Sequence, residues 1–381
     1  MHLLTLTPFY PTVENDASGC FIAEAVGELE HQGIQSSVIA VHPMHRSQPG
    51  LDPKAPAAMM RSFISVPGHA GLSTAGSFLY AALKSYVRRI HAQRPICLIH
   101  AHAALPCGHA AMLLSEDLGV PYVVSVHGLD VFSSRQVPGW FGLRCAERSQ
   151  EIYAAAARVI CISEKVALPI REKLGEAVEA TVLYNGVDPT LFVPGPRNGQ
   201  SNPVIVSVGN LIEIKGHELL LRALATVSRD YPRLECRIIG DGVERVRLLD
   251  LSRALGIQDH VRFLGRRSRR EVAQAMSECT LFALPSWYEG LGCVYLEAMS
   301  AGCAAMACYG QGMDELIRHG ENGWLVQPKD VDDLANGLHV LLSDPALCDR
   351  IGRCGRETIL QGLTWKHHAE HLQSIYQACV A

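Results

Sequence analysis

Two glutamates, Glu289 and Glu297, lie eight residues apart with a glycine-rich turn between them. The stretch from Ser286 to Gly302 reads S-W-Y-E-G-L-G-C-V-Y-L-E-A-M-S-A-G, and a short apolar run precedes it. This pattern predicts a strand, a tight turn and a helix that begins near Cys293. Glu289 then lies in the loop, and Glu297 lies about one turn inside the helix. Free backbone N–H groups and the positive end of the helix dipole meet there, which suits an anionic or hydroxyl-rich ligand.

A lysine stands at a second junction of this kind. Residues 209–216 read G-N-L-I-E-I-K-G, between an apolar run and a helical pattern. Lys215, at a glycine-flanked helix start, can reach a phosphate bound at that N-terminus. On these residues alone a lysine before a helix is also compatible with a purely structural turn.

Histidines end two of the expected strands in the first half of the chain. The run His127-Gly128-Leu129-Asp130 follows a strand-like segment, and His100 and His102 end another. Such a histidine can simply be a satisfied polar residue. No third metal ligand pairs with His100 and His102, so we interpret these two as a polar cleft wall rather than a metal site.

The elements that must position these residues alternate along the chain. Apolar runs predict strands at residues 3–7, 35–41, 61–66, 97–100, 122–126 and 158–162, and again at 204–208, 235–239, 261–264, 281–284, 304–307 and 324–326. Helical patterns separate most of them, for example at 20–32, 105–118 and 142–157. This alternation predicts an α/β protein with two parallel, doubly wound sheets. A segment rich in proline and glycine, residues 185–202, is the expected domain boundary, and residues 365–380 form a last helix.

Composition narrows the class of protein. The chain has 381 residues, which is too long for one ordinary core, and 48% of them are hydrophobic. A net charge of −4 gives no sign of nucleic-acid binding. Thirteen cysteines without any C-x-x-C spacing suggest reduced thiols in a cytoplasmic protein. The apolar run before Pro8 is too short for a signal peptide or a membrane span.

The stretch around Glu289 resembles the signature of the retaining glycosyltransferases of family 4. Its usual form is E-G-F-G-x-x-x-x-E-A-M-A-x-G, and this chain departs from it only at Leu291 and Ser300. The segment with Lys215 resembles the family's G-R-L-x-x-x-K-G, whose arginine and lysine bind the donor diphosphate. Asn210 stands in place of that arginine, so charge stabilisation must depend on Lys215, helix dipoles or another arginine.

Further segments resemble the family at other points. The family's H-G-x-D, whose histidine lies beside the transferred sugar, matches His127 and Asp130. Gly240-Asp241-Gly242 is similar to a turn near the nucleotide, and residues 185–188 (N-G-V-D) to the interdomain hinge; plain turns would look the same. Where the family often has paired glycines after the first strand, this chain has only Ser18-Gly19.

The resemblance implies a GT-B type fold of two Rossmann-like domains facing a central cleft. Residues 1–186 would bind the acceptor and 187–362 the nucleotide-sugar donor, and 363–381 would cross back to the first domain. The implied catalytic residues are His127, Lys215 and Glu289. The implied donor-binding residues are Gly19, Asn210, Lys215, Gly240, Gly242, Glu289, Gly290, Leu291, Gly292 and Glu297. Asn15, Asp16 and Asp130 would contact the acceptor, and neither a metal nor a cofactor is required.

The implied reaction moves a sugar from a UDP- or GDP-sugar, with retention, to a glycan or lipid-linked acceptor in cell-surface polysaccharide synthesis. A sugar-nucleotide epimerase shares the architecture but would not need Glu289 and Lys215 in these motifs. A dehydrogenase would carry G-x-G-x-x-G after the first strand, where this chain has P-F-Y-P. A non-catalytic sugar-nucleotide-binding protein also remains open, because Asn210 replaces the arginine.

Three charged segments each have two interpretations. Asp330 and Asp332 look like a D-x-D metal motif, but Asp330 is better interpreted as a helix N-cap. The arginines 262, 266, 267, 269 and 270 are interpreted as a solvated face. Residues 77–92 form an amphipathic helix with a basic edge (Lys84, Arg88, Arg89), in a region without acidic residues between Asp52 and Glu116. That helix either covers a sheet or binds an anionic membrane surface, which would make the protein peripheral on the cytoplasmic face of the inner membrane.

Overall fold

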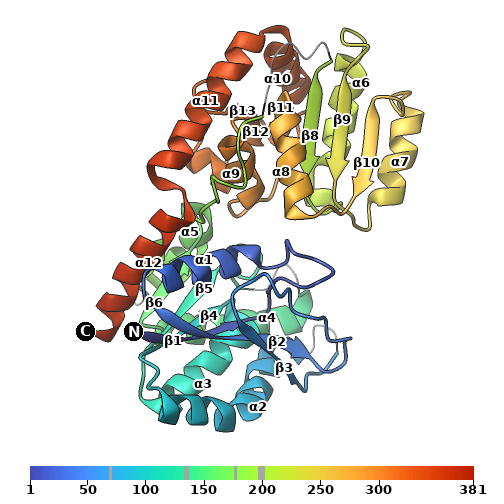
Figure 1. Ribbon diagram of the computed structural model, residues 1–381. Helices are drawn as coiled ribbons and strands as arrows, with labels where there is room; N and C mark the ends of the chain where they lie inside the picture. The colour runs from blue at the N-terminus through green and yellow to red at the C-terminus, as the bar shows by residue number, and fades with distance from the viewer. Residues whose placement is uncertain (68–70, 133–136, 176–177, 196–201) are drawn as a thin grey trace. The chain divides into compact units, whose positions relative to one another are not determined.

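A computed structural model describes residues 1–67, 71–132, 137–175, 178–195 and 202–381 (Figure 1). The chain divides into two compact units. Unit 1 comprises Met1–Tyr184 and Trp365–Ala381, and unit 2 comprises Asn185–Thr364. The chain passes from one unit to the other after Tyr184 and after Thr364. Each of these two boundaries lies two residues from the boundary expected from the sequence. The expected boundary segment, residues 185–202, lies in part outside the described residues.

Unit 1 is built on a seven-stranded sheet with the order β3-β2-β1-β4-β5-β6-β7. Its strands are β1 (His2–Thr7), β2 (Gln35–Pro43), β3 (Ala58–Phe63), β4 (Leu98–His102), β5 (Tyr122–Val126), β6 (Arg158–Cys161) and β7 (Ala180–Val182). Every neighbouring pair is parallel. Strands β1, β4 and β5 are buried along their whole length, as expected for a sheet covered on both faces.

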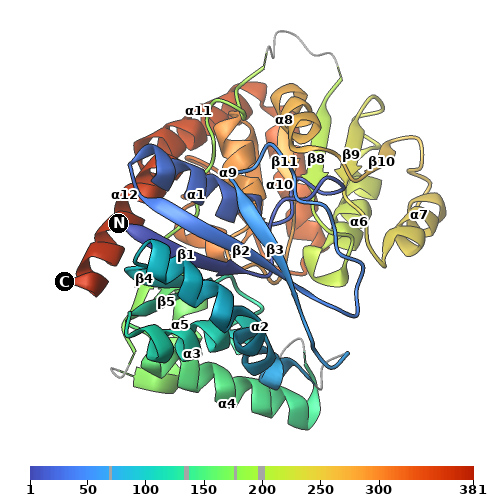
Figure 2. The ribbon, with the colours of Figure 1, turned by 60° about the horizontal axis from the view of Figure 1, so that its bottom comes forward.

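Helices cover both faces of this sheet (Figure 2). The helices of unit 1 are α1 (Cys20–His31), α2 (Leu72–Gln93), α3 (His109–Leu118), α4 (Gly139–Ala155), α5 (Glu164–Leu174) and α12 (Trp365–Val380). Helices α1 and α12 lie on one face and α2, α3 and α4 on the other. Leu372 and Tyr376 of α12 are buried in a cluster with Leu3, Leu98 and Val123, which places the C-terminal helix in the core of unit 1.

Unit 2 has a six-stranded sheet with the order β10-β9-β8-β11-β12-β13. Its strands are β8 (Val204–Val208), β9 (Glu235–Ile239), β10 (Val261–Gly265), β11 (Leu281–Ala283), β12 (Ala304–Cys308) and β13 (Trp324–Val326), again all parallel. Its helices are α6 (His217–Val227), α7 (Arg245–Ala254), α8 (Arg269–Glu278), α9 (Cys293–Ser300), α10 (Val331–Ser343) and α11 (Pro345–Gly362). The predicted pair of parallel α/β sheets is therefore confirmed.

In both sheets the order in which successive strands are added reverses beside the first strand. In unit 1 the order reverses between β1 and β4, and in unit 2 between β8 and β11. Loops at the carboxyl ends of such neighbouring strands diverge to opposite faces and leave room for a ligand. The residues singled out in the sequence follow these strands, so the fold collects them at one edge of each sheet.

Some local expectations need correction. The strand expected at 61–66 is β3, three residues earlier, and it ends at Phe63. The helix expected at 105–118 begins as α3 at His109, after a π-helical turn (Ala104–Gly108). The N-cap interpretation of Asp330 is confirmed, since its side chain accepts a hydrogen bond from the Asp333 N–H at 2.9 Å. No helix in the described part of the chain combines the length and the hydropathy that crossing a bilayer requires.

Candidate active site

The turn before α9 depends on a glycine. Gly292 has φ = +83°, and a Cβ there would lie 2.7 Å from the Tyr295 ring. The same Cβ would lie 3.1 Å from the Glu289 carboxyl carbon. A residue with a side chain is therefore excluded, and the Glu289 carboxylate occupies the space at the N-terminus of α9. Free N–H groups of the helix point toward this place.

Lys215 meets Glu289 across 74 residues of sequence. The Lys215 Nζ donates to Glu289 Oε2 at 2.5 Å, and both side chains are largely shielded, with 18% and 12% of their surface exposed. The loops that carry them are in contact, because a Cβ on Gly216 would lie 2.2 Å from the Pro285 carbonyl oxygen. The structure thus brings together two residues that the sequence offered as separate motifs.

Glu297 faces Arg269, which we expected from the sequence on a solvated face. Arg269, the first residue of α8, approaches Glu297 Oε1 at 3.4 Å, and its guanidinium lies over the Phe192 ring at 5.6 Å. Arg269 is therefore largely buried, whereas the other four arginines of the cluster (262, 266, 267 and 270) are exposed as expected. Burial raises the pKa of Glu297, and Arg269 lowers it in opposition.

The remaining residues of this region lie at the ends of β8 and β9. A Cβ on Gly240 would lie 1.9 Å from the Gly209 carbonyl oxygen, and one on Gly242 2.3 Å from that of Leu211, so both glycines are required for the close approach of the two loops. Asn210 is exposed at the start of its loop, and within the described residues its side chain makes no hydrogen bond to Lys215 or Glu289.

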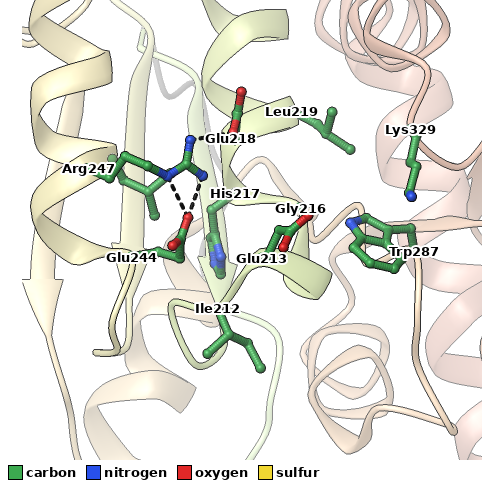
Figure 3. A pocket seen from close by; sticks show the side chains of 11 residues that line it. Ile212, Glu213, Gly216, His217, Glu218, Leu219, Glu244, Arg247, Trp287 and Lys329 are labelled. Carbon is green, nitrogen blue, oxygen red and sulfur yellow. Dashed lines mark hydrogen bonds and ion pairs between the residues drawn. The ribbon is translucent and has the colours of Figure 1, made fainter. Parts of the chain in front are cut away.

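A pocket of about 230 Å³ adjoins the loop of Lys215 (Figure 3). Its two cationic side chains contact neighbours: Arg247 bridges Glu218 and Glu244, and the Lys329 ammonium lies 3.9 Å from the centre of the Trp287 ring. No sequence pattern marks this pocket, because its lining residues come from separate segments of the chain.

Two buried polar atoms in the segment after β5 lack a hydrogen-bond partner in the described part of the chain. His127 Nδ1 and Asp130 Oδ2 are buried, and neither has a hydrogen-bond partner among the described residues. The other oxygen of Asp130 accepts from the His127 N–H at 2.9 Å, which fixes the turn. Burial raises the pKa of Asp130 to about 6 and lowers that of His127 to about 3. Unpaired polar atoms of this kind are typical of a site that a ligand completes.

A row of histidine rings backs His127. His127 Nε2 and His102 Nδ1 are 3.2 Å apart, and their rings stack at 5.4 Å. His100 lies behind them and hydrogen-bonds the Tyr376 hydroxyl at 2.6 Å and the Ser125 hydroxyl at 2.7 Å. Burial lowers the pKa of both His100 and His102. These rings are therefore neutral, and His100 and His102 belong to the core of unit 1.

The loop after β1 and the start of α1 lie close to His127. Gly19 has φ = +63° and a Cβ there would lie 2.5 Å from the Phe9 carbonyl carbon, so the tight turn needs glycine. The neighbouring Phe21 places its ring 4.8 Å from that of His127. Asn15 and Asp16 lie half-buried in the same loop. The sequence gives no indication of the contact between Phe21 and His127, nor of the contact between Arg269 and Glu297.

Comparison with known proteins agrees with this geometry. A family model described as glycosyltransferase family 4 matches residues 21–191, and one described as glycosyl transferases group 1 matches residues 194–358. The chain belongs to glycosyltransferase family 4. This glycosyltransferase is 28% identical to a D-inositol 3-phosphate glycosyltransferase of Stackebrandtia nassauensis over 95% of the chain and 87% of the relative. It is 27% identical to an alpha-maltose-1-phosphate synthase of Mycobacterium tuberculosis over the full length of both.

Solved structures identify the fold. Sucrose-phosphate synthase from Thermosynechococcus elongatus superposes with a TM-score of 0.83 at 22% identity, with 99% of each chain covered. HepE of Anabaena, solved in complex with UDP, gives a TM-score of 0.75 at 21% identity over 99% of this chain and all of that one. The glycosyltransferase therefore has the GT-B fold that its sequence predicts.

Proposed function

We propose that this enzyme is a retaining glycosyltransferase that uses a UDP- or GDP-sugar and a lipid-linked glycan acceptor in cell-surface polysaccharide synthesis. The observation that carries the proposal is the Lys215–Glu289 pair at the N-terminus of α9, with Glu297 one turn further along. A cation, a carboxylate and a set of free N–H groups in one place suit a sugar diphosphate. The solved complexes of HepE with UDP and with UDP-glucose support a uridine nucleotide in particular.

Unit 2 would bind the donor. Glu297 would accept hydrogen bonds from the ribose hydroxyls, and Glu289 with Gly290, Leu291 and Gly292 would hold the sugar. The bond from the anomeric carbon to the diphosphate oxygen breaks, and the acceptor oxygen bonds to the same face. The departing diphosphate takes the acceptor's proton. Lys215 and the helix N-termini would balance its negative charge, so the reaction would not need a metal ion.

Substitution of the two glutamates separates their roles. Glu297→Gln should lower the affinity for the free nucleoside diphosphate, because the ribose hydroxyls lose a charged hydrogen-bond acceptor. Glu289→Gln should leave nucleoside diphosphate affinity nearly unchanged and lower turnover and sugar discrimination. Calorimetry with UDP and with GDP on the two variants and the unmodified protein measures this difference. Equal affinity in both variants would contradict the assigned roles.

Unit 1 would bind the acceptor through Asn15, Asp16 and Asp130, whereas His127 would act beside the transferred sugar and Gly19 would contact the donor. Several large apolar side chains of unit 1 are exposed. They lie in the chain segments that follow β1, β2, β3 and β5, and we call them the apolar rim: Phe9, Val13, Met44, Ile64, Val66, Trp140, Phe141 and Leu143. We propose that the apolar rim contacts a membrane that carries the acceptor.

Charge on the same unit supports a membrane as well. Lys84 and Arg89 are exposed on α2, although Arg88 is engaged by Asp117 of α3 at 2.8 Å. The basic edge expected from the sequence is therefore smaller in the structure. The Trp140 ring lies 5.0 Å from the Arg144 guanidinium, a combination of aromatic and basic groups suited to a lipid interface. We propose that the enzyme acts peripherally on the cytoplasmic face of the inner membrane.

Vesicle flotation tests the apolar rim. The protein should float with vesicles that contain phosphatidylglycerol, and raised salt should reduce but not abolish this binding, since part of it is apolar. Trp140→Ser with Leu143→Ser should abolish the residual binding at high salt. Leu168→Ser with Leu360→Ser removes two exposed leucines elsewhere and is the matched control. Protein that stays in the soluble fraction at low salt would contradict the proposal of a membrane surface.

A further inference from the structure

The backbone of Glu289 is held by one short segment on the neighbouring strand end. Its N–H donates to the side-chain Oε1 of Gln311 at 3.0 Å, and its carbonyl accepts from the Gly312 N–H at 3.2 Å. Gln311 follows β12, and only 8% of its surface is exposed. Both backbone groups of Glu289 are thus tied to adjacent residues, one of them through a side chain.

The two segments are in direct contact at this point. A Cβ on Gly312 would lie 1.8 Å from the Gly290 carbonyl oxygen, so the segment after β12 approaches the turn as closely as a backbone can. The Glu289 carboxylate in turn lies against Gly292 and Lys215. A shift of the Glu289 backbone would therefore move the carboxylate away from Lys215 and the helix N-terminus.

We propose that Gln311 is a positioning residue for Glu289 and sets the place of its carboxylate in the donor site. The inference rests on the function proposed above. The Glu289 N–H precedes α9 by four residues and is outside the helix, so the Gln311 amide oxygen is the acceptor that satisfies it. Without that oxygen a half-buried N–H would be left without an acceptor, and the turn would relax toward another one. Misplacement of a reacting group by about 1 Å can cost about 10²-fold in rate.

A double-mutant cycle distinguishes positioning from simple stability. Gln311→Met has a similar length but no acceptor, and it should lower turnover by about 10- to 100-fold with little change in UDP affinity. In the Glu289→Gln background the same change should alter turnover less than about twofold, because the group that it positions is already lost. Any loss of thermal stability should be similar in both backgrounds. Gln274→Met, on the exposed face of α8, is the control.

The outcomes separate this inference from the proposed function. Turnover of Gln311→Met within twofold of the unmodified protein, or the same fold loss in both backgrounds, would overturn the positioning role. Unchanged turnover of Glu289→Gln would instead contradict the proposed function. If Gln311→Met does not fold, Gln311→Ala, which also removes the side-chain acceptor, is assayed in the same cycle with the same expected result.

Discussion

Lys215→Ala should reduce turnover by ~10² to 10³ while the protein stays folded. Lys215 supplies the positive charge at the place where charge on the leaving diphosphate develops, and Asn210 brings none beside it. The substitution also leaves the Glu289 carboxylate without its cation, which adds repulsion toward a diphosphate. Release of nucleoside diphosphate measures the rate, and the thermal midpoint shows whether folding is intact.

Lys173→Ala provides the comparison for this variant. Lys173 is an exposed lysine of α5 in unit 1 and should behave like the unmodified protein. A Lys215→Ala enzyme that kept a tenth of normal turnover would show that Lys215 does not stabilise the leaving diphosphate. Lys215→Arg should recover only part of the loss, since the guanidinium is planar and larger than the ammonium.

Acid should destabilise unit 1 steeply. Burial lowers the pKa of His100 and His127 to about 3 and that of His109 and His368 to about 4, all in this unit. The unfolded chain, with histidine pKa values near 6.5, therefore binds protons first as the pH falls. Each such histidine lowers the free energy of unfolding by roughly 1 kcal/mol per pH unit between about pH 6.5 and its folded pKa.

Denaturant unfolding at pH 7.5, 6 and 5 measures this slope. His100→Gln removes one titrating ring and should make the dependence on pH shallower by about one proton. His45→Gln, at an exposed site, should leave the slope unchanged. A free energy of unfolding that did not fall between pH 6.5 and 5 would show that the buried histidines are protonated at little cost in the folded state.

The sequence predicted those parts of the fold that follow local patterns. Strands such as Tyr122–Val126 and Glu235–Ile239 match residue for residue, because short runs that contain β-branched residues and stand between proline and glycine are typical of strands. The strand predicted at 61–66 was wrong because Ile64 and Val66 are apolar yet exposed, so hydrophobicity there does not report burial. Periodicity cannot separate a core residue from an exposed apolar one.

The candidate site was predictable only through its motifs. Glu289 and Lys215 were found because each lies in a recognisable sequence motif. Their contact joins loops that follow different strands, so no local sequence pattern predicts it. Arg269 was misassigned to a solvated face because its neighbours in sequence are exposed arginines. Its burial arises from α9 and Phe192, which only the folded chain brings close.

The most direct test of the account is proton NMR of the unmodified enzyme with UDP-glucose and with GDP-mannose, each supplied as the α-linked donor. We expect that at least one donor is consumed and that the sugar first transferred, or first released to water, keeps the α configuration. We also expect that Lys215→Ala slows this reaction in proportion to its loss of turnover. A sugar that first appears in the β configuration, or consumption that Lys215→Ala leaves unchanged, would contradict the retaining mechanism at the Lys215–Glu289 site.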